Sequence, residues 1–162
     1  MRCLLFAYAV LFSVFGSAGL AQTDRFTSDV RSVFQAMVLY CIQVMESAPL
    51  ADGLVQLGFS KALGGHNKSA RLKVKGSFVK VLVLATAKHN STECTVNISE
   101  VGKSEHRAIF DVFGALFSKK GYQLTKAALH GGRQQDAYSK GSALIRLRYR
   151  QGPSKIGFQM NR

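Results

Sequence analysis

The chain has 162 residues, of which 22 are Lys or Arg and 9 are Asp or Glu, for a formal net charge of +13. Its length suits one ordinary domain, and its hydrophobic share of 47% excludes a disordered chain. A basic excess of this size keeps a protein soluble and attracts anions. The partners to consider are therefore nucleic acid, anionic lipid or polysaccharide, and acidic proteins.

The start of the chain has the pattern of a secretory signal peptide. Arg2 supplies a positive charge, residues 3–15 are apolar but too few to span a bilayer comfortably, and Gly19-Leu20-Ala21 offers small residues for signal peptidase. We expect a signal peptide over 1–21, cleaved after Ala21, with Gln22 as the first residue of a periplasmic or secreted protein. The alternative is an uncleaved anchor. No apolar run in the mature chain is long enough for a transmembrane segment.

An amphipathic helix is predicted next. Thr27 or Ser28 suits the N-cap, and Asp29 suits the first turn. Apolar residues then recur at three- and four-residue spacing, which marks one helix face: Val30, Val33, Phe34, Met37, Cys41, Val44 and Met45. Pro49 favours the start of a second, short helix that ends at Gly58.

A run of strands is predicted after the second helix. Gly64–Ser69 is predicted as a loop, Arg71–Lys75 as an alternating strand, and Gly76-Ser77 as a two-residue hairpin turn. Phe78–Thr86 is nearly all apolar, which predicts a central strand buried on both faces. Residues 94–98 alternate between apolar and polar, which predicts a strand with one buried face.

A further helix and further strands are predicted in the second half. Ser104 suits the N-cap, Glu105 the first turn, and Gly121-Tyr122 the C-terminal cap. The helix has an apolar stripe of Ile109, Val112, Phe113, Leu116 and Phe117. Strands are predicted over 124–129, 143–150 and 156–160, with turns at Gly131-Gly132, Gly141-Ser142 and Gly152-Pro153.

The two halves share an order of landmarks. Lys75-Gly76-Ser77 recurs as Lys140-Gly141-Ser142, and a strand pattern follows each. We interpret this as an internal repeat over about 26–99 and 104–162 within a single domain, 22–162; convergence of two glycine turns is the alternative. The predicted fold class is α+β, an antiparallel sheet with helices packed on one face, because the connectors are short.

The order of landmarks resembles that of small uncharacterised secreted proteins of Gram-negative bacteria. The landmarks are a signal peptide, a helical cysteine, a Gly-Phe pair, a strand cysteine and a helix that ends in Gly-aromatic: Cys41, Gly58-Phe59, Cys94 and Gly121-Tyr122. The resemblance covers the mature chain. It implies a periplasmic or secreted protein and no particular activity.

Two cysteines remain once Cys3 leaves with the signal peptide. Cys41 lies on the apolar stripe of the first helix, and Cys94 lies on the predicted buried face of a strand. Both thiols therefore point into the layer between helix and sheet. In a disulfide-permissive compartment this pair predicts a Cys41–Cys94 disulfide, and two buried free thiols are the alternative.

Motifs of catalysis and metal binding are missing from the sequence. It has no nucleophile elbow, phosphate-binding loop or dinucleotide fingerprint. Its histidines lack metal-ligand spacing and are predicted in loops or at helix starts: His66, His89, His106 and His130. Asp136 is predicted in a loop. We therefore expect no cofactor and no metal, with a metal site shared by His66 and His130 as the alternative.

The candidate site is a row of arginines on the strand 143–150. Arg146, Arg148 and Arg150 alternate, so their side chains share one strand face, about 7 Å apart. Guanidinium groups bind phosphate, sulfate and carboxylate, which predicts an anion-binding platform. The alternative is a solvated strand face whose charge prevents unwanted pairing. Aligned on the repeat, these arginines match Val81, Val83 and Ala85; Lys73, Lys75 and Lys80 extend the platform only if the strand register permits.

The sequence favours a non-enzymatic binding module of the periplasm or cell exterior. Its basic strand face would engage an anionic surface (lipid, polysaccharide or nucleic acid) or an acidic partner protein. The alternative is a small secreted hydrolase or nuclease that uses loop histidines on an anionic substrate. Two histidines and a carboxylate converging in a pocket would favour that alternative.

Overall fold

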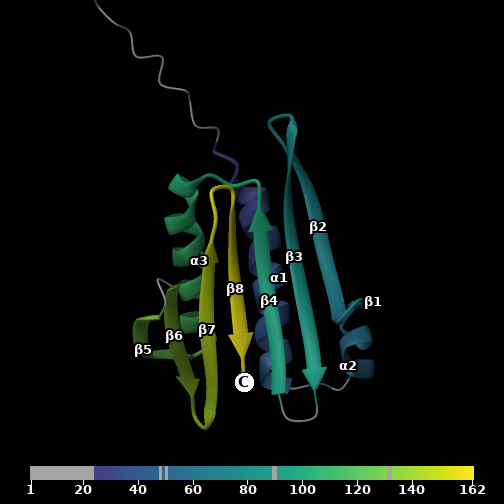
Figure 1. Cartoon of the computed structure of the whole chain (residues 1–162), viewed down its shortest axis with the longest axis vertical. Coiled ribbons are helices and arrows are strands. Elements are labelled where there is room, and N and C mark those ends of the chain that lie inside the picture. Colours follow the sequence, from purple (N-terminus) through teal and green to yellow (C-terminus); the bar gives the residue numbers. More distant parts are fainter. Residues whose placement is uncertain (1–23, 48, 50, 89–90, 131–132) are drawn as a thin grey trace, which may run out of the picture.

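The computed structural model describes residues 24–47, 49, 51–88, 91–130 and 133–162, so the predicted signal peptide and its cleavage position lie outside the described residues. The described chain combines helices with an eight-stranded antiparallel sheet (Figure 1). The helical elements are α1 (Ser28–Ser47), α2 (Ala51–Gln56), the 3-10 turn η1 (Lys103–Glu105) and α3 (His106–Lys119). The strands are β1 (Ser60–Ala62), β2 (Gly65–Val74), β3 (Ser77–Lys88), β4 (Ser91–Ser99), β5 (Gln123–His130), β6 (Arg133–Lys140), β7 (Ala143–Gln151) and β8 (Lys155–Asn161).

The strand order in the sheet is β1-β2-β3-β4-β8-β7-β6-β5, and every neighbouring pair is antiparallel. The first four strands and the last four thus meet where β4 pairs with β8. The predicted combination of helices with an antiparallel sheet is confirmed.

Helix α1 packs against β3, β4, β8 and α3, and Figure 1 shows it behind the middle of the sheet. Thr27 is the N-cap, as predicted, because its Oγ1 accepts a hydrogen bond from the Val30 N–H at 3.4 Å. The Phe34 ring of α1 lies 5.8 Å from that of Phe158 on β8. Phe34 and Phe158 are fully buried, which places the centre of the core between α1 and β8.

Helix α3 contacts the sheet through aromatic side chains. Phe113 stacks on Phe158 with ring centroids 4.2 Å apart, and Phe117 stacks on Tyr138 of β6 at 4.4 Å. The aromatic members of the apolar stripe predicted for this helix, Phe113 and Phe117, therefore pack against β8 and β6. After the helix, the Tyr122 N–H donates to the Phe117 carbonyl and Gly121 has a φ of +81°, which confirms the predicted C-terminal cap.

The sulfur atoms of Cys41 on α1 and Cys94 on β4 lie at disulfide distance, as the sequence predicted, with Cα atoms 5.5 Å apart. Both residues are fully buried. The pair joins the helix layer to the sheet at a sequence separation of 53 residues.

Several predicted elements are wrong. Most of the predicted loop Gly64–Ser69 belongs to β2, and the sequence analysis missed β1 and β6. These strands carry many polar residues, so their hydrogen bonds to neighbouring strands, not apolar periodicity, define them. Ser104 is not the N-cap of α3 but lies within η1, which begins after Gly102.

The expectation that Phe78–Thr86 is buried on both faces is also wrong. Odd-numbered residues of β3 from Val79 to Ala85 are at most 1% exposed, whereas Phe78 and Leu84 are 42% and 41% exposed. Helix α1 covers only the odd-numbered side of this strand. The even-numbered apolar residues therefore face outward.

The two Lys-Gly-Ser triplets occupy different places in their hairpins. Val74 pairs with Ser77, so the β2–β3 turn is Lys75-Gly76, with φ values of +47° and +80°. The predicted turn Gly76-Ser77 is therefore wrong by one residue. Lys140 pairs with Ala143, so the β6–β7 turn is Gly141-Ser142, as predicted.

This one-residue difference corrects the alignment of the two strands that follow the turns. Ser77 and Ala143 each begin a strand, so Val79 corresponds to Ile145 and Lys80 to Arg146. Val79 and Ile145 are both buried. The arginines of β7 therefore do not replace the buried valines of β3, because they lie on the opposite face.

Candidate functional site: the outer face of the sheet

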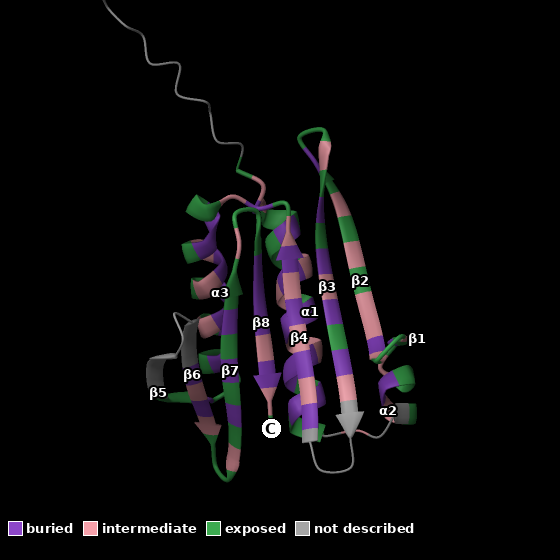
Figure 2. Cartoon of the chain, viewed as in Figure 1, coloured by how far each residue is buried: buried purple, intermediate pink, exposed green. Residues whose placement is uncertain are grey.

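The three arginines of β7 are exposed and lie on one face. Arg146, Arg148 and Arg150 are exposed, whereas the residues between them, Leu147 and Tyr149, are at most 5% exposed. Figure 2 shows this alternation as exposed and buried bands along β7. We call the side of the sheet that carries these arginines, and the outward-pointing residues of its other strands, the outer face.

The register of β7 and β8 defines what lies beside each arginine. Arg146 is opposite Asn161, Arg148 is opposite Gln159, and Arg150 is opposite Gly157. Directly opposed residues in an antiparallel pair have side chains on the same face. The arginine row is thus flanked by uncharged residues of β8.

The strand register also places lysines of the first half on the outer face. Lys80 on β3 is opposite Ser99 on β4, and Ser99 is opposite Lys155 on β8. Lys155 is two residues from Gly157, the partner of Arg150, so it lies on the arginine side of the sheet. Arg71 lies opposite Lys80, and Lys73, two residues from Arg71, also points outward.

A set of seven basic side chains therefore shares the outer face, and we call it the basic row: Arg71, Lys73, Lys80, Arg146, Arg148, Arg150 and Lys155. Lys75 is outside the row because it lies in a turn. Among the described outward-pointing residues, Glu93 on β4 is the one carboxylate. Its Oε1 accepts a hydrogen bond from Gln159 Nε2 at 2.5 Å.

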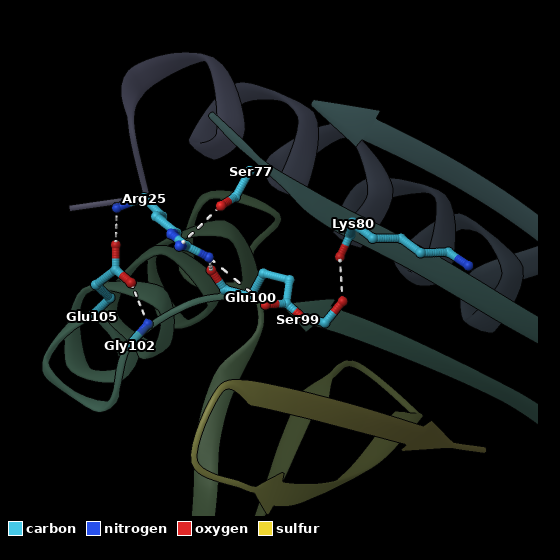
Figure 3. Close-up of polar contacts among 7 residues, drawn as sticks. All are labelled: Arg25, Ser77, Lys80, Ser99, Glu100, Gly102 and Glu105. Atoms are coloured by element: carbon cyan, nitrogen blue, oxygen red, sulfur yellow. Dashed lines mark hydrogen bonds and ion pairs between the residues drawn. The ribbon is translucent and has the colours of Figure 1, made fainter. Parts of the chain in front are cut away.

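A polar network fixes the corner of the molecule near the basic row (Figure 3). The buried Glu105 carboxylate accepts hydrogen bonds from the backbone N–H groups of Arg25, Phe26 and Gly102, the second at 2.6 Å. The Arg25 guanidinium donates to Ser77 Oγ at 3.2 Å. The start of the described chain is thus held against both η1 and β3. The sequence placed Glu105 in a helical first turn and missed this contact.

The described histidines do not form the arrangement that would favour an enzyme. His106 lies at the start of α3, as predicted, whereas His66 belongs to β2 and its predicted place in a loop is wrong. Both residues are buried. The side chains of His89 and His130 lie outside the described residues. Among the described residues, those that line a pocket of about 380 Å³ include His106 and Lys103 but no carboxylate. A smaller one of about 140 Å³ includes His66 and Glu93.

Because side chains alternate along each strand, the His66 ring and the Glu93 carboxylate point to opposite faces of the sheet. His66 is opposite the buried Ala85, whereas Glu93 is opposite Thr86, which points outward. Over the described ranges, no cluster of three or more His, Cys, Asp or Glu side chains could hold a metal ion.

A buried polar pair lies under the arginine strand. The Tyr149 hydroxyl donates to Asp136 Oδ2 at 2.5 Å, and both residues are buried. Burial, together with this hydrogen bond, raises the pKa of Tyr149, and burial also raises the pKa of Tyr138. Asp136 belongs to β6, so its predicted place in a loop is wrong. The pair fixes the inner side of β7 beneath Arg148 and Arg150.

No helix in the described part of the chain is long and apolar enough to cross a membrane. Comparison of the chain with models of protein families, with curated proteins and with solved structures finds no match.

Proposed function

We propose that the chain is a periplasmic or secreted, non-enzymatic binding module whose outer face engages an anionic surface or an acidic partner protein. The observation that carries the proposal is the exposed alignment of Arg146, Arg148 and Arg150 on one strand. Guanidinium groups in fixed positions offer paired donors to phosphate, sulfate or carboxylate. The proposed location rests on the signal-like pattern over 1–21 and on the buried cysteine pair.

The arrangement of the helices supports an open binding face. The residues that α1 and α3 contact on β3, β4, β7 and β8 are the buried ones, and the basic row points the other way. We infer that the helices pack on one face of the sheet and leave the outer face to the partner. A flat, basic surface of several strands suits an extended ligand better than a small molecule.

The order of elements supports the proposed internal repeat. Each half contributes a long helix followed by four strands, and the two sets of strands meet in mirrored order at β4 and β8. We infer two pseudo-equivalent halves that differ on the outer face. The second half supplies three arginines from one strand, where the first supplies Lys80 between apolar neighbours.

Charge reversal tests the proposal. The variant Arg146→Glu/Arg148→Glu/Arg150→Glu is compared with Lys61→Glu/Lys119→Glu/Lys120→Glu, which changes the net charge equally at exposed positions off the outer face. Retention on heparin and on vesicles with anionic headgroups is measured, with folding checked by thermal melts. We expect the arginine variant to lose at least tenfold more affinity than the lysine variant. Equal losses would show that net charge alone attracts anions and would overturn the proposal.

A further inference from the structure

Between Lys155 and Glu93, the outward positions of the strands beside the arginines carry uncharged hydrogen-bonding groups. Five outward residues of β4 and β8 carry hydroxyl or amide side chains, and we call them the polar band: Thr95, Asn97, Ser99, Gln159 and Asn161. All five are partly exposed. The polar band thus separates the arginines of β7 from Lys80 and Arg71.

A glycine shapes this band. Gly157 lies between Asn97 of β4 and Arg150 of β7 in one cross-strand row. A β-carbon on Gly157 would stand 2.5 Å from Asn97 Oδ1, so the Asn97 amide lies over the glycine. The absence of a side chain therefore lets the amide lean across β8 toward the arginine strand.

A hydrogen bond joins one amide of the band to the carboxylate of Glu93. Gln159 Nε2 donates to Glu93 Oε1 at 2.5 Å, which orients both side chains. Glu93 lines the pocket of about 140 Å³ with Thr86 and Thr95. A carboxylate accepts hydrogen bonds from hydroxyl groups and repels anions. This end of the outer face therefore suits a hydroxyl-bearing part of a ligand and disfavours a phosphate.

The described outward positions offer few aromatic rings on which the bases of a nucleic acid could stack. Phe78 is the one aromatic side chain among the described outward positions of β2, β3, β4, β7 and β8, and the Arg71 guanidinium lies 3.9 Å from its ring centroid. Proteins that bind single-stranded nucleic acid usually stack bases on exposed aromatic rings. The polar band offers amides and hydroxyls instead.

We propose that the ligand of the outer face is an acidic polysaccharide, an inference that rests on the proposed anion-binding function. Its carboxylate groups pair with Arg146, Arg148 and Arg150 on β7. Its hydroxyl groups hydrogen-bond with the polar band of β4 and β8 and with Glu93. A polymer that carries both carboxylates and neutral hydroxyls matches a surface on which a row of guanidinium groups lies beside a band of amides and hydroxyls.

The test compares two polyanions at the same ionic strength. Oligogalacturonate is the saccharide probe and inorganic polyphosphate is the charge-only probe, with affinity measured by calorimetry on the full mature chain. The variant Gln159→Leu removes an amide from the polar band. Gln43→Leu removes an exposed amide from α1 and is the matched control. We expect Gln159→Leu to weaken oligogalacturonate binding about five- to tenfold, as for one lost hydrogen bond, and to leave polyphosphate binding within twofold.

The outcomes separate this inference from the proposed function. Tighter binding of polyphosphate than of oligogalacturonate, or equal loss of both probes in Gln159→Leu, would overturn the saccharide assignment and leave a general anion site. Single-stranded DNA that competes fully with oligogalacturonate would point instead to a nucleic-acid ligand. If the triple arginine variant binds both probes as tightly as the wild type, the anion-binding function itself fails.

Discussion

The side-chain oxygen Oδ1 of Asn97 lies 2.5 Å from the place where a β-carbon of Gly157 would stand. The variant Gly157→Ala must therefore displace the Asn97 side chain from its position over Gly157. We expect a small change in the free energy of unfolding, about 1 kcal/mol or less, because the displaced group is the end of a side chain rather than backbone. The chemical shift of the Asn97 side-chain amide should change, and oligogalacturonate affinity should fall.

Gly114→Ala is the matched control for that variant. An added β-carbon there has no heavy atom within 4 Å, and the residue lies inside α3. Alanine should stabilise the helix by about 0.5–1 kcal/mol, with no change in ligand affinity. An unchanged Asn97 amide signal in Gly157→Ala would contradict the described packing.

The Glu105 carboxylate should be a main determinant of local stability. Glu105→Gln removes a buried charge that accepts three backbone hydrogen bonds, so we expect unfolding to become easier by about 2 kcal/mol. Amide hydrogen exchange at Phe26 should accelerate. Glu100→Gln is the control, because that exposed carboxylate lies 3.7 Å from the Arg25 guanidinium and should contribute less than about 0.5 kcal/mol. Similar losses from both variants would argue against the special role of Glu105.

The Cys41–Cys94 pair should be oxidised in protein purified from an oxidising compartment. Closing a loop of this size contributes about 4 kcal/mol in the chain-entropy model, and both cysteines are buried. We expect no free thiol in denatured, unreduced protein, and a lower melting temperature after reduction. Two free thiols per chain would show that the pair is a reduced contact within the core.

Stability should fall at high pH because of Tyr122. Burial, together with the nearby Glu46 carboxylate, whose Oε1 accepts a hydrogen bond from the Tyr122 hydroxyl at 3.2 Å, raises the pKa of Tyr122 from 10.0 to about 12. The folded chain thus retains a proton that the unfolded chain releases above pH 10. This contribution to stability is complete below pH 10 and is lost as the pH rises toward about 12. In Tyr122→Phe, the free energy of unfolding, measured by denaturant titration, should fall less steeply between pH 10 and about 12. An equally steep fall in the variant would show that other groups cause the loss of stability.

The sequence predicted features that depend on local periodicity and on single residues. The phase of α1, the glycine cap before Tyr122 and the inward positions of Cys41 and Cys94 follow from three- and two-residue spacing, and each is found in the structure. The alternation of Arg146, Arg148 and Arg150 likewise placed them correctly on one face.

Features that depend on pairing between distant segments could not be predicted in this way. Whether Lys80 and Lys155 share a face with Arg150 depends on the register of β3, β4 and β8, which no single strand encodes. The sequence predicted a turn at Gly76-Ser77, but the turn is Lys75-Gly76. This shift of one residue exchanges the faces of the sheet in the alignment of β3 with β7, so that the arginines of β7 no longer correspond to the buried valines of β3. The hydrogen bonds of Glu105 and Asp136 could not be predicted because their partners are distant in sequence or lie on another strand.

The most direct test of the central claim is to map the bound ligand by NMR. Isotope-labelled mature chain is titrated with oligogalacturonate, and changes are followed at backbone amides and arginine side chains. We predict the largest changes at Arg146, Arg148 and Arg150 and along the outward positions of β4 and β8, with little change at Lys61, Lys119 and Lys120. Changes spread evenly over exposed lysines, or confined to the pocket beside Lys103 and His106, would contradict a binding site on the outer face.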